Sequence, residues 1–163
     1  MCQNILHPLE PVFDSRSRVL VLGTMPSPKS REQGFYYAHP RNRFWTVLPA
    51  LLGEPIPKSV SDRKALVLRR HIALWDVLKS CTITGAADSS IKDPVPNDLR
   101  PILSAAPIRA VFTTGGKAHT LYRRLCMPLC GVEDIPLPST SPANCAMSEA
   151  DLKEAYSILL NYL

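Results

Sequence analysis

Short runs of aliphatic residues alternate along this chain with segments of helical periodicity, and this alternation restricts the fold more than any other feature. Buried strands are predicted at residues 18–23, 72–77, 108–113 and 134–138. The last run contains two prolines, which favours an edge position. Strands separated by helices usually pair in parallel. The sequence therefore predicts an α/β fold, a three-layer sandwich with a central, mostly parallel four-stranded sheet flanked by helices.

The first predicted helix begins near residue 42. Its apolar residues have the i, i+3, i+4, i+7 spacing of one helix face: they are Phe44, Val47, Leu48 and Leu51. Pro49 lacks a backbone N–H and is expected to end or kink the helix. A loop containing Pro26 and Pro28 is expected before it, and the polar residues 80–97 are expected to form a surface loop.

The later helices are predicted from capping residues and apolar spacing. They are expected at 62–70 with Ser61 as the cap, from Asn97 to residue 105, and at 117–126. The last helix has Ser148 as its cap and Asp151 at the third helical position. Its buried stripe is predicted to consist of Leu152, Tyr156, Leu159, Leu160 and Leu163.

Length and composition indicate an ordinary soluble globule. The 163 residues fit one domain, expected over 1–163, and 45% are hydrophobic while 20% are charged. No apolar run approaches the roughly 18 residues of a membrane helix. We therefore expect a cytoplasmic, nucleoid-associated monomer with no membrane partner.

The net charge of +5 is compatible with a polyanionic partner. Six basic residues stand among the first 43 positions, against three acidic ones. A solvated basic face without any ligand remains open as an alternative.

The five cysteines are odd in number and widely spaced, so we expect no disulfide framework. Two of them, Cys126 and Cys130, lack further ligands nearby in sequence, and neither a metal nor a cofactor is expected.

Three segments have residues suited to nucleic-acid chemistry. Residues 22–27 end a strand at glycine and turn through proline, which can expose backbone N–H groups to a phosphate or a base edge. Residues 34–45 interleave aromatic and basic side chains, which stack on bases and contact phosphates. Residues 137–144 combine three hydroxyls with two prolines. Each segment has an alternative without a ligand. Residues 22–27 would then be an ordinary turn, and residues 34–45 part of a helix core with a structural His39. Residues 137–144 would be a polar connector.

Together these segments resemble the uracil-DNA glycosylase superfamily. Gly-x-x-Pro-Ser at 23–27 looks like its first motif, and Pro-Ser-Thr-Ser-Pro-Ala-Asn at 138–144 looks like its second. The segments 36–45 and 73–81 are similar to its hypoxanthine (deoxyinosine) glycosylase branch. The likeness extends from Val19 to the last helix. It implies base flipping and hydrolysis of the N-glycosidic bond during base excision repair.

The likeness also assigns roles to residues. Other branches place a water-activating residue where this chain has Met25, and several place a histidine at Ser139. The branch implies that Asn42 supplies catalysis. From the chemistry of an amide, its carbonyl is expected to accept from a water while its NH2 donates elsewhere. Capping of the following helix is the alternative role for Asn42. Ala143 falls at the position of the wedge, with Asn144 beside it.

Two further groups of site residues are predicted. The base pocket is expected to contain Gly23, Thr24, Met25, Tyr37, Phe44 and Asp76. Contacts to DNA are expected from Ser27, Lys29, Arg41, Arg43, Ser139, Thr140, Ser141, Ala143 and Asn144. Tyr37 is the first candidate to stack on the base and Phe44 the second, while Asp76 either contacts substrate or is buried and structural.

The predicted function is a monofunctional DNA glycosylase for deaminated bases, hypoxanthine first, with DNA containing such a base as its partner. A glycosylase for uracil or thymine mismatches and a non-catalytic DNA-binding protein of the same fold are the alternatives. An unrelated nucleotide-binding α/β protein is disfavoured because no glycine-rich phosphate fingerprint is present.

Overall fold

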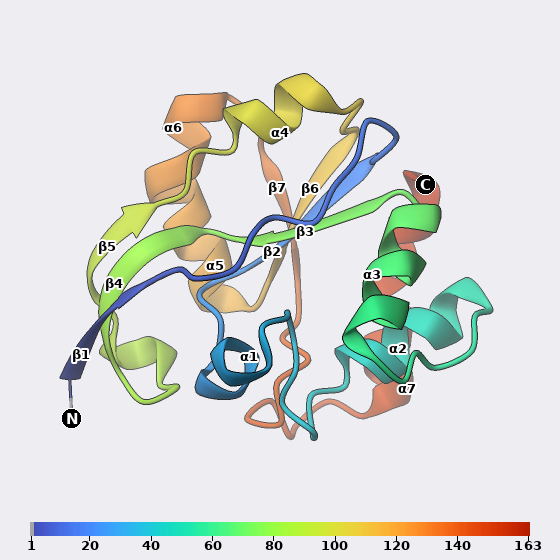
Figure 1. Cartoon of the computed structure of the whole chain (residues 1–163), viewed down its shortest axis with the longest axis horizontal. Helices are drawn as coiled ribbons and strands as arrows, with labels where there is room; N and C mark the ends of the chain where they lie inside the picture. The colour runs from blue at the N-terminus through green and yellow to red at the C-terminus, as the bar shows by residue number, and fades with distance from the viewer. Residues whose placement is uncertain (1) are drawn as a thin grey trace.

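The structure, a computed structural model, describes residues 2–163 and is built around a parallel sheet of four strands (Figure 1). The strand order is β3–β2–β6–β7, and all three pairings are parallel. The strands are β2 (Val19–Gly23), β3 (Ile72–Asp76), β6 (Ala110–Thr114) and β7 (Asp134–Leu137). Helices cover both faces of this sheet, so the predicted α/β sandwich is confirmed, including the edge position of β7.

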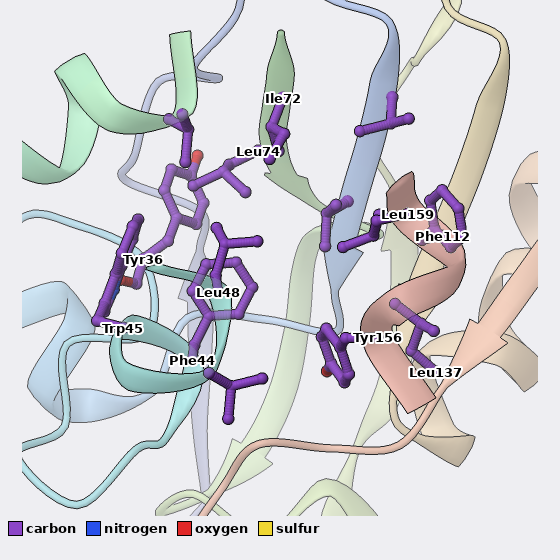
Figure 2. Close-up of a cluster of buried hydrophobic side chains, with 14 of the residues drawn as sticks. Tyr36, Phe44, Trp45, Leu48, Ile72, Leu74, Phe112, Leu137, Tyr156 and Leu159 are labelled. Atoms are coloured by element: carbon purple, nitrogen blue, oxygen red, sulfur yellow. The ribbon is translucent and has the colours of Figure 1, made fainter. Parts of the chain in front are cut away.

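Successive residues of each central strand point to opposite faces, which divides the apolar core into two layers. In β2, Val19 and Val21 belong to one cluster of buried side chains, and Leu20 and Leu22 belong to the other. Figure 2 shows part of the first cluster, in which aromatic side chains lie between the sheet and its helices. Both faces of the sheet are covered by buried apolar side chains, as is typical of parallel sheets.

The two helical layers differ in composition. The first cluster is covered by α2 (Phe44–Leu52), α3 (Val60–Arg69), α7 (Glu149–Tyr156) and the 3-10 helix η3 (Ser157–Asn161). The second is covered by α4 (Arg100–Ala105), α5 (Gly116–Leu121), the π-helix η2 (Tyr122–Cys126) and α6 (Met127–Cys130). No helix among residues 2–163 is long and apolar enough to cross a membrane.

A second sheet was not predicted. The antiparallel strands β1 (Cys2–Leu6), β4 (Leu78–Thr84) and β5 (Lys92–Pro96) pair in the order β1–β4–β5, with the 3-10 helix η1 (Asp88–Ser90) between β4 and β5. The interpretation of 80–97 as a surface loop was therefore wrong. In β4 the buried residues Leu78, Cys81 and Ile83 pack on the second core cluster, whereas β5 carries prolines and is mostly exposed.

Two predictions based on prolines in the first third of the chain are also corrected. The expected loop contains a short helix, α1 (Pro28–Gln33), with Pro28 at its first turn, where a missing N–H costs nothing. Pro49 lies inside α2 and does not end it. The helix continues to Leu52 and ends at Gly53, whose left-handed φ of 67° brings its N–H to the carbonyls of the last turn.

Three details of the later helices differ from prediction. Ser59, not Ser61, caps α3, because its hydroxyl accepts a hydrogen bond from the Asp62 N–H at 3.0 Å. Asn97 does not cap α4, since its amide donates to the backbone carbonyls of Asp76 and Leu78, where β3 ends and β4 begins. The capping box of Ser148 in α7 is as predicted, but Leu160 is 46% exposed because the chain tightens into η3.

Candidate active site

A cavity of roughly 710 Å³ opens at the carboxyl ends of the central strands, where ligands bind in open α/β sheets. The loop after β2, the start of α5 and the segment 139–144 form three of its walls. The turn after β4 and the first residue of η1 form another, at 85–88. The sequence-predicted site residues that line it are Gly23, Thr24, Met25, Ser27, Tyr37, Asn42, Asp76, Ser139, Thr140, Ser141, Ala143 and Asn144.

The Asn42 side chain is fixed by two hydrogen bonds to the same oxygen. Its Oδ1 accepts from the backbone N–H of Phe44 at 2.9 Å and from the Thr140 hydroxyl at 2.8 Å. An amide oxygen has two lone pairs, and both are therefore occupied. The Nδ2 group has no acceptor among residues 2–163, and Asn42 lines the cavity. Asn42 thus presents N–H donors, which corrects the predicted role of its carbonyl in holding a water.

The segment 139–144 is held against the start of α2 by Arg43. The Arg43 guanidinium donates to the carbonyls of Ser141 at 3.0 Å, Asn144 at 2.6 Å and Met147. Its donors point into the protein, so the predicted phosphate contact is replaced by a bracing role. The predicted DNA contact of Thr140 is also corrected, because the residue is 1% exposed and its hydroxyl donates to Asn42 Oδ1.

Tyr37 and Phe44 were alternatives for stacking on a base, and the structure separates them. Their rings stack with centroids 4.0 Å apart and planes within 10°. Phe44 is 1% exposed in the core cluster of Figure 2 and does not line the cavity, so its predicted place there was wrong. Tyr37 lines the cavity with an unusual positive φ of 53°, a strained geometry typical of functional sites.

The Tyr37 hydroxyl is a fixed donor at the cavity wall. The Thr114 Oγ1 donates to the Leu22 carbonyl at 3.3 Å, which leaves it to accept from the Tyr37 hydroxyl at 3.1 Å. Burial raises the pKa of Tyr37 well above its usual value, and the nearby charge of Asp76 raises it further. Tyr37 therefore stays protonated and neutral at the pH of a cell.

Asp76 places a buried carboxylate at the carboxyl end of β3. Its Oδ2 lies 2.8 Å from Nε2 of His7, and its side chain is 6% exposed. Oδ1 has no hydrogen-bond donor among residues 2–163 and packs over Gly23, where a methyl group would lie 2.5 Å from it. Glycine at position 23 is thus required by this close approach. Nothing in the sequence pattern indicated His7.

The other predicted DNA contacts lie around the cavity mouth or on the surface. Ser27 caps α1 by accepting from the Ser30 N–H at 3.2 Å. Lys29 is exposed and pairs weakly with Glu32 at 3.4 Å. Arg41 is exposed, outside the cavity lining. Ala143, Ser139 and Ser141 line the cavity, and the Asn144 amide is turned inward to the Ser139 carbonyl at 2.9 Å.

The sequence prediction did not include residues 85–88 in the base pocket, because 80–97 was interpreted as a surface loop. Burial raises the pKa of the Asp88 carboxyl, and the charge of Lys117 opposes this shift. Asp88 lines the cavity and is its second acidic residue beside Asp76. Within residues 2–163 no group of three His, Cys, Asp or Glu side chains is placed to hold a metal ion.

Comparison with known proteins agrees with this geometry. Residues 10–161 match the model of the uracil DNA glycosylase superfamily. A protein of Methanosarcina acetivorans named hypoxanthine DNA glycosylase is 32% identical over 134 residues, covering 82% of this chain and 84% of its own. Its namesake in Methanosarcina barkeri is 33% identical over 135 residues, covering 82% and 85% respectively.

A solved structure supports the same assignment. The solution NMR structure of a candidate uracil DNA glycosylase from Methanosarcina acetivorans superposes with a TM-score of 0.77 at 29% sequence identity. The superposition covers 93% of this chain and 96% of that protein. With a matched family model over residues 10–161 and a cavity at the expected sheet edge, this chain belongs to the uracil DNA glycosylase superfamily.

Proposed function

We propose that this protein is a monofunctional DNA glycosylase that removes hypoxanthine from DNA and leaves an abasic site. The observation that carries the proposal is the cavity at the strand ends, which combines the N–H donors of Asn42 with an unpaired oxygen of Asp76. The two relatives named hypoxanthine DNA glycosylase support the choice of base. A base inside a duplex must leave the stack to reach such a cavity, and deaminated bases pair weakly enough to favour this step.

Recognition is proposed to depend on the ring N–H of the base. Hypoxanthine presents N1–H beside the C6 carbonyl, whereas adenine presents an acceptor at N1 and a donor at C6. The Asp76 carboxylate can only accept, so an oxygen that faces N1 pairs with the N1–H of hypoxanthine and is repelled by the N1 lone pair of adenine. Tyr37 stacks on Phe44 with one ring face, and its opposite face is proposed to stack on the purine ring.

Bond cleavage is proposed to proceed with Asn42 as a donor. When the C1′–N9 bond breaks, its electron pair moves to the base and the sugar becomes cationic. A water then adds its oxygen to C1′, and its proton is taken up by the departing base. The Nδ2 donors of Asn42 stabilise the electron density that collects on a ring nitrogen or carbonyl of the base. Because Met25 and Ser139 cannot activate a water, positioning contributes most of the acceleration.

Uracil shares the donor–acceptor pair of hypoxanthine, so its removal is the principal alternative. The test is a panel of labelled duplexes that differ only in one nucleotide: hypoxanthine, uracil, xanthine or adenine. After incubation, alkali cleaves the strand wherever a base has been lost. Cleavage is expected first with hypoxanthine and not with adenine. Faster release of uracil would assign the enzyme to the alternative, and binding without any cleavage would make it a non-catalytic DNA-binding protein.

A further inference from the structure

His7 reaches the active site from the other sheet. The residue follows β1, and its backbone N–H donates to the Lys79 carbonyl at 2.7 Å, which extends the pairing of β1 with β4. This pairing brings the imidazole to Asp76 at the end of β3, 69 residues away in sequence. The His7 side chain is only 3% exposed. It lies outside residues 10–161, the part of the chain that matches the superfamily model.

The hydrogen bonds of His7 define its neutral tautomer. The backbone N–H of Leu9 donates to Nδ1 at 3.3 Å, so Nδ1 is the acceptor of the ring. Nε2 therefore carries the proton and donates to Oδ2 of Asp76 at 2.8 Å. The rings of Tyr36 and Trp75 pack on the imidazole with centroids 6.2 Å away in each case. His7 is thus held at both nitrogens and by two neighbouring rings.

Asp76 depends on this contact. A carboxylate buried to this extent is costly unless hydrogen bonds satisfy it, and His7 is its only side-chain donor among residues 2–163. With Oδ2 engaged by His7, Oδ1 is the oxygen that lies over Gly23. Asp76 lines the cavity, so this unpaired oxygen is the acceptor available to a bound base.

We propose that His7 is a positioning residue for base selection, which holds the Asp76 carboxylate so that Oδ1 accepts the ring N–H of the lesion. The inference rests on the proposed function, because it concerns selection of the same base. His7 itself touches no substrate. Its contribution is the orientation of Asp76, and its loss affects bases with a ring N–H at that position more than bases without one.

Two substitutions separate this role from a structural one. Gln places its amide nitrogen near the position of Nε2, so His7→Gln keeps a donor for Asp76. Asn reaches only as far as Nδ1, so His7→Asn keeps an acceptor for the Leu9 N–H and loses the donor. If His7 only anchors the chain around Leu9, Asn is the better replacement. If it positions Asp76, Gln is.

The experiment compares duplexes containing hypoxanthine with duplexes containing 1-methylhypoxanthine, which has no ring N–H. Both nucleotides carry a 2′-fluoro group that prevents cleavage, and equilibrium dissociation constants give the preference for the N–H for the parent and both variants. A hydrogen bond to a charged group corresponds to a preference of about 10- to 100-fold in the parent. His7→Gln is expected to stay within about threefold of that preference, and His7→Asn to lose most of it.

A preference that is unchanged in His7→Asn, or one that is lost in His7→Gln and kept in His7→Asn, would overturn the proposal. So would a parent protein that binds both duplexes equally. Thermal melts of the three proteins check that each is folded. Because the duplexes cannot be cleaved, the result does not depend on turnover. Failure of the parent to release hypoxanthine from an ordinary duplex would reject the proposed function and leave the His7 measurement valid.

Discussion

Replacement of Asn42 by Asp is the most informative change to the proposed chemistry. Asp retains an oxygen that can accept from Phe44 N–H and the Thr140 hydroxyl, the two bonds that fix the side chain at 2.9 and 2.8 Å. It replaces the Nδ2 donors with a second, negatively charged acceptor. We expect Asn42→Asp to keep its stability within about 1 kcal/mol. We expect base release to fall on the order of 10²–10³, as when one preorganised donor is removed from an enzyme site.

Asn42→Ala provides the comparison, because it removes the acceptor as well. The Phe44 N–H and the Thr140 hydroxyl both lose their partner, at about 1 kcal/mol each. The sum of about 2 kcal/mol corresponds to a fall in Tm of about 4–8 °C for a chain of this size. The rate of base release by Asn42→Ala should fall as far as that of Asn42→Asp. The fall in Tm of about 4–8 °C should be seen only in Asn42→Ala.

The assay is single-turnover release of hypoxanthine, combined with a thermal melt of each variant. The two possible roles of the amide predict opposite results for Asn42→Asp. If Asn42 works through an oxygen that activates water, a carboxylate should release the base at least as fast as the parent does. A rate for Asn42→Asp close to that of the parent would therefore refute the donor role.

Two further predictions concern the pocket and the DNA surface. Gly23→Ala should fold but release hypoxanthine far more slowly than the parent in the same assay, because the new methyl group would lie 2.5 Å from Asp76 Oδ1; a parent-like rate would show that this oxygen is not needed. DNA binding should weaken with salt by a log–log slope of about −0.9 per phosphate neutralised, and Lys29→Gln or Arg41→Gln should each reduce the slope by about one unit. If neither substitution changes the slope, neither Lys29 nor Arg41 contacts a DNA phosphate.

The sequence predicts the central sheet well because its signal is local. Aliphatic runs such as Val19–Leu22 are buried on both faces and are recognisable without knowledge of their partners. The second sheet has no comparable signal. β1 is largely exposed and β5 contains two prolines, so both strands depend on pairing with β4 rather than on their own composition.

Motif residues of the site were predicted, whereas their connections were not. Asn42, Tyr37 and Asp76 do line one cavity. The contacts that orient them join distant positions: Thr140 reaches Asn42 across 98 residues, and His7 reaches Asp76 across 69. No local periodicity carries such information. The same limit explains why Arg43 was predicted to face DNA, although its guanidinium braces the 139–144 segment.

The central claim, that this protein releases hypoxanthine from DNA, is tested most directly by identifying the product. A duplex with one deoxyinosine is incubated with excess protein, and the free base and the abasic sites are both quantified over time by mass spectrometry and alkali cleavage. The expected result is release of hypoxanthine in a one-to-one ratio with abasic sites, with the adenine duplex left intact and Asn42→Asp slowed on the order of 10²–10³. Tight binding of the deoxyinosine duplex with no free hypoxanthine at any time would contradict the claim.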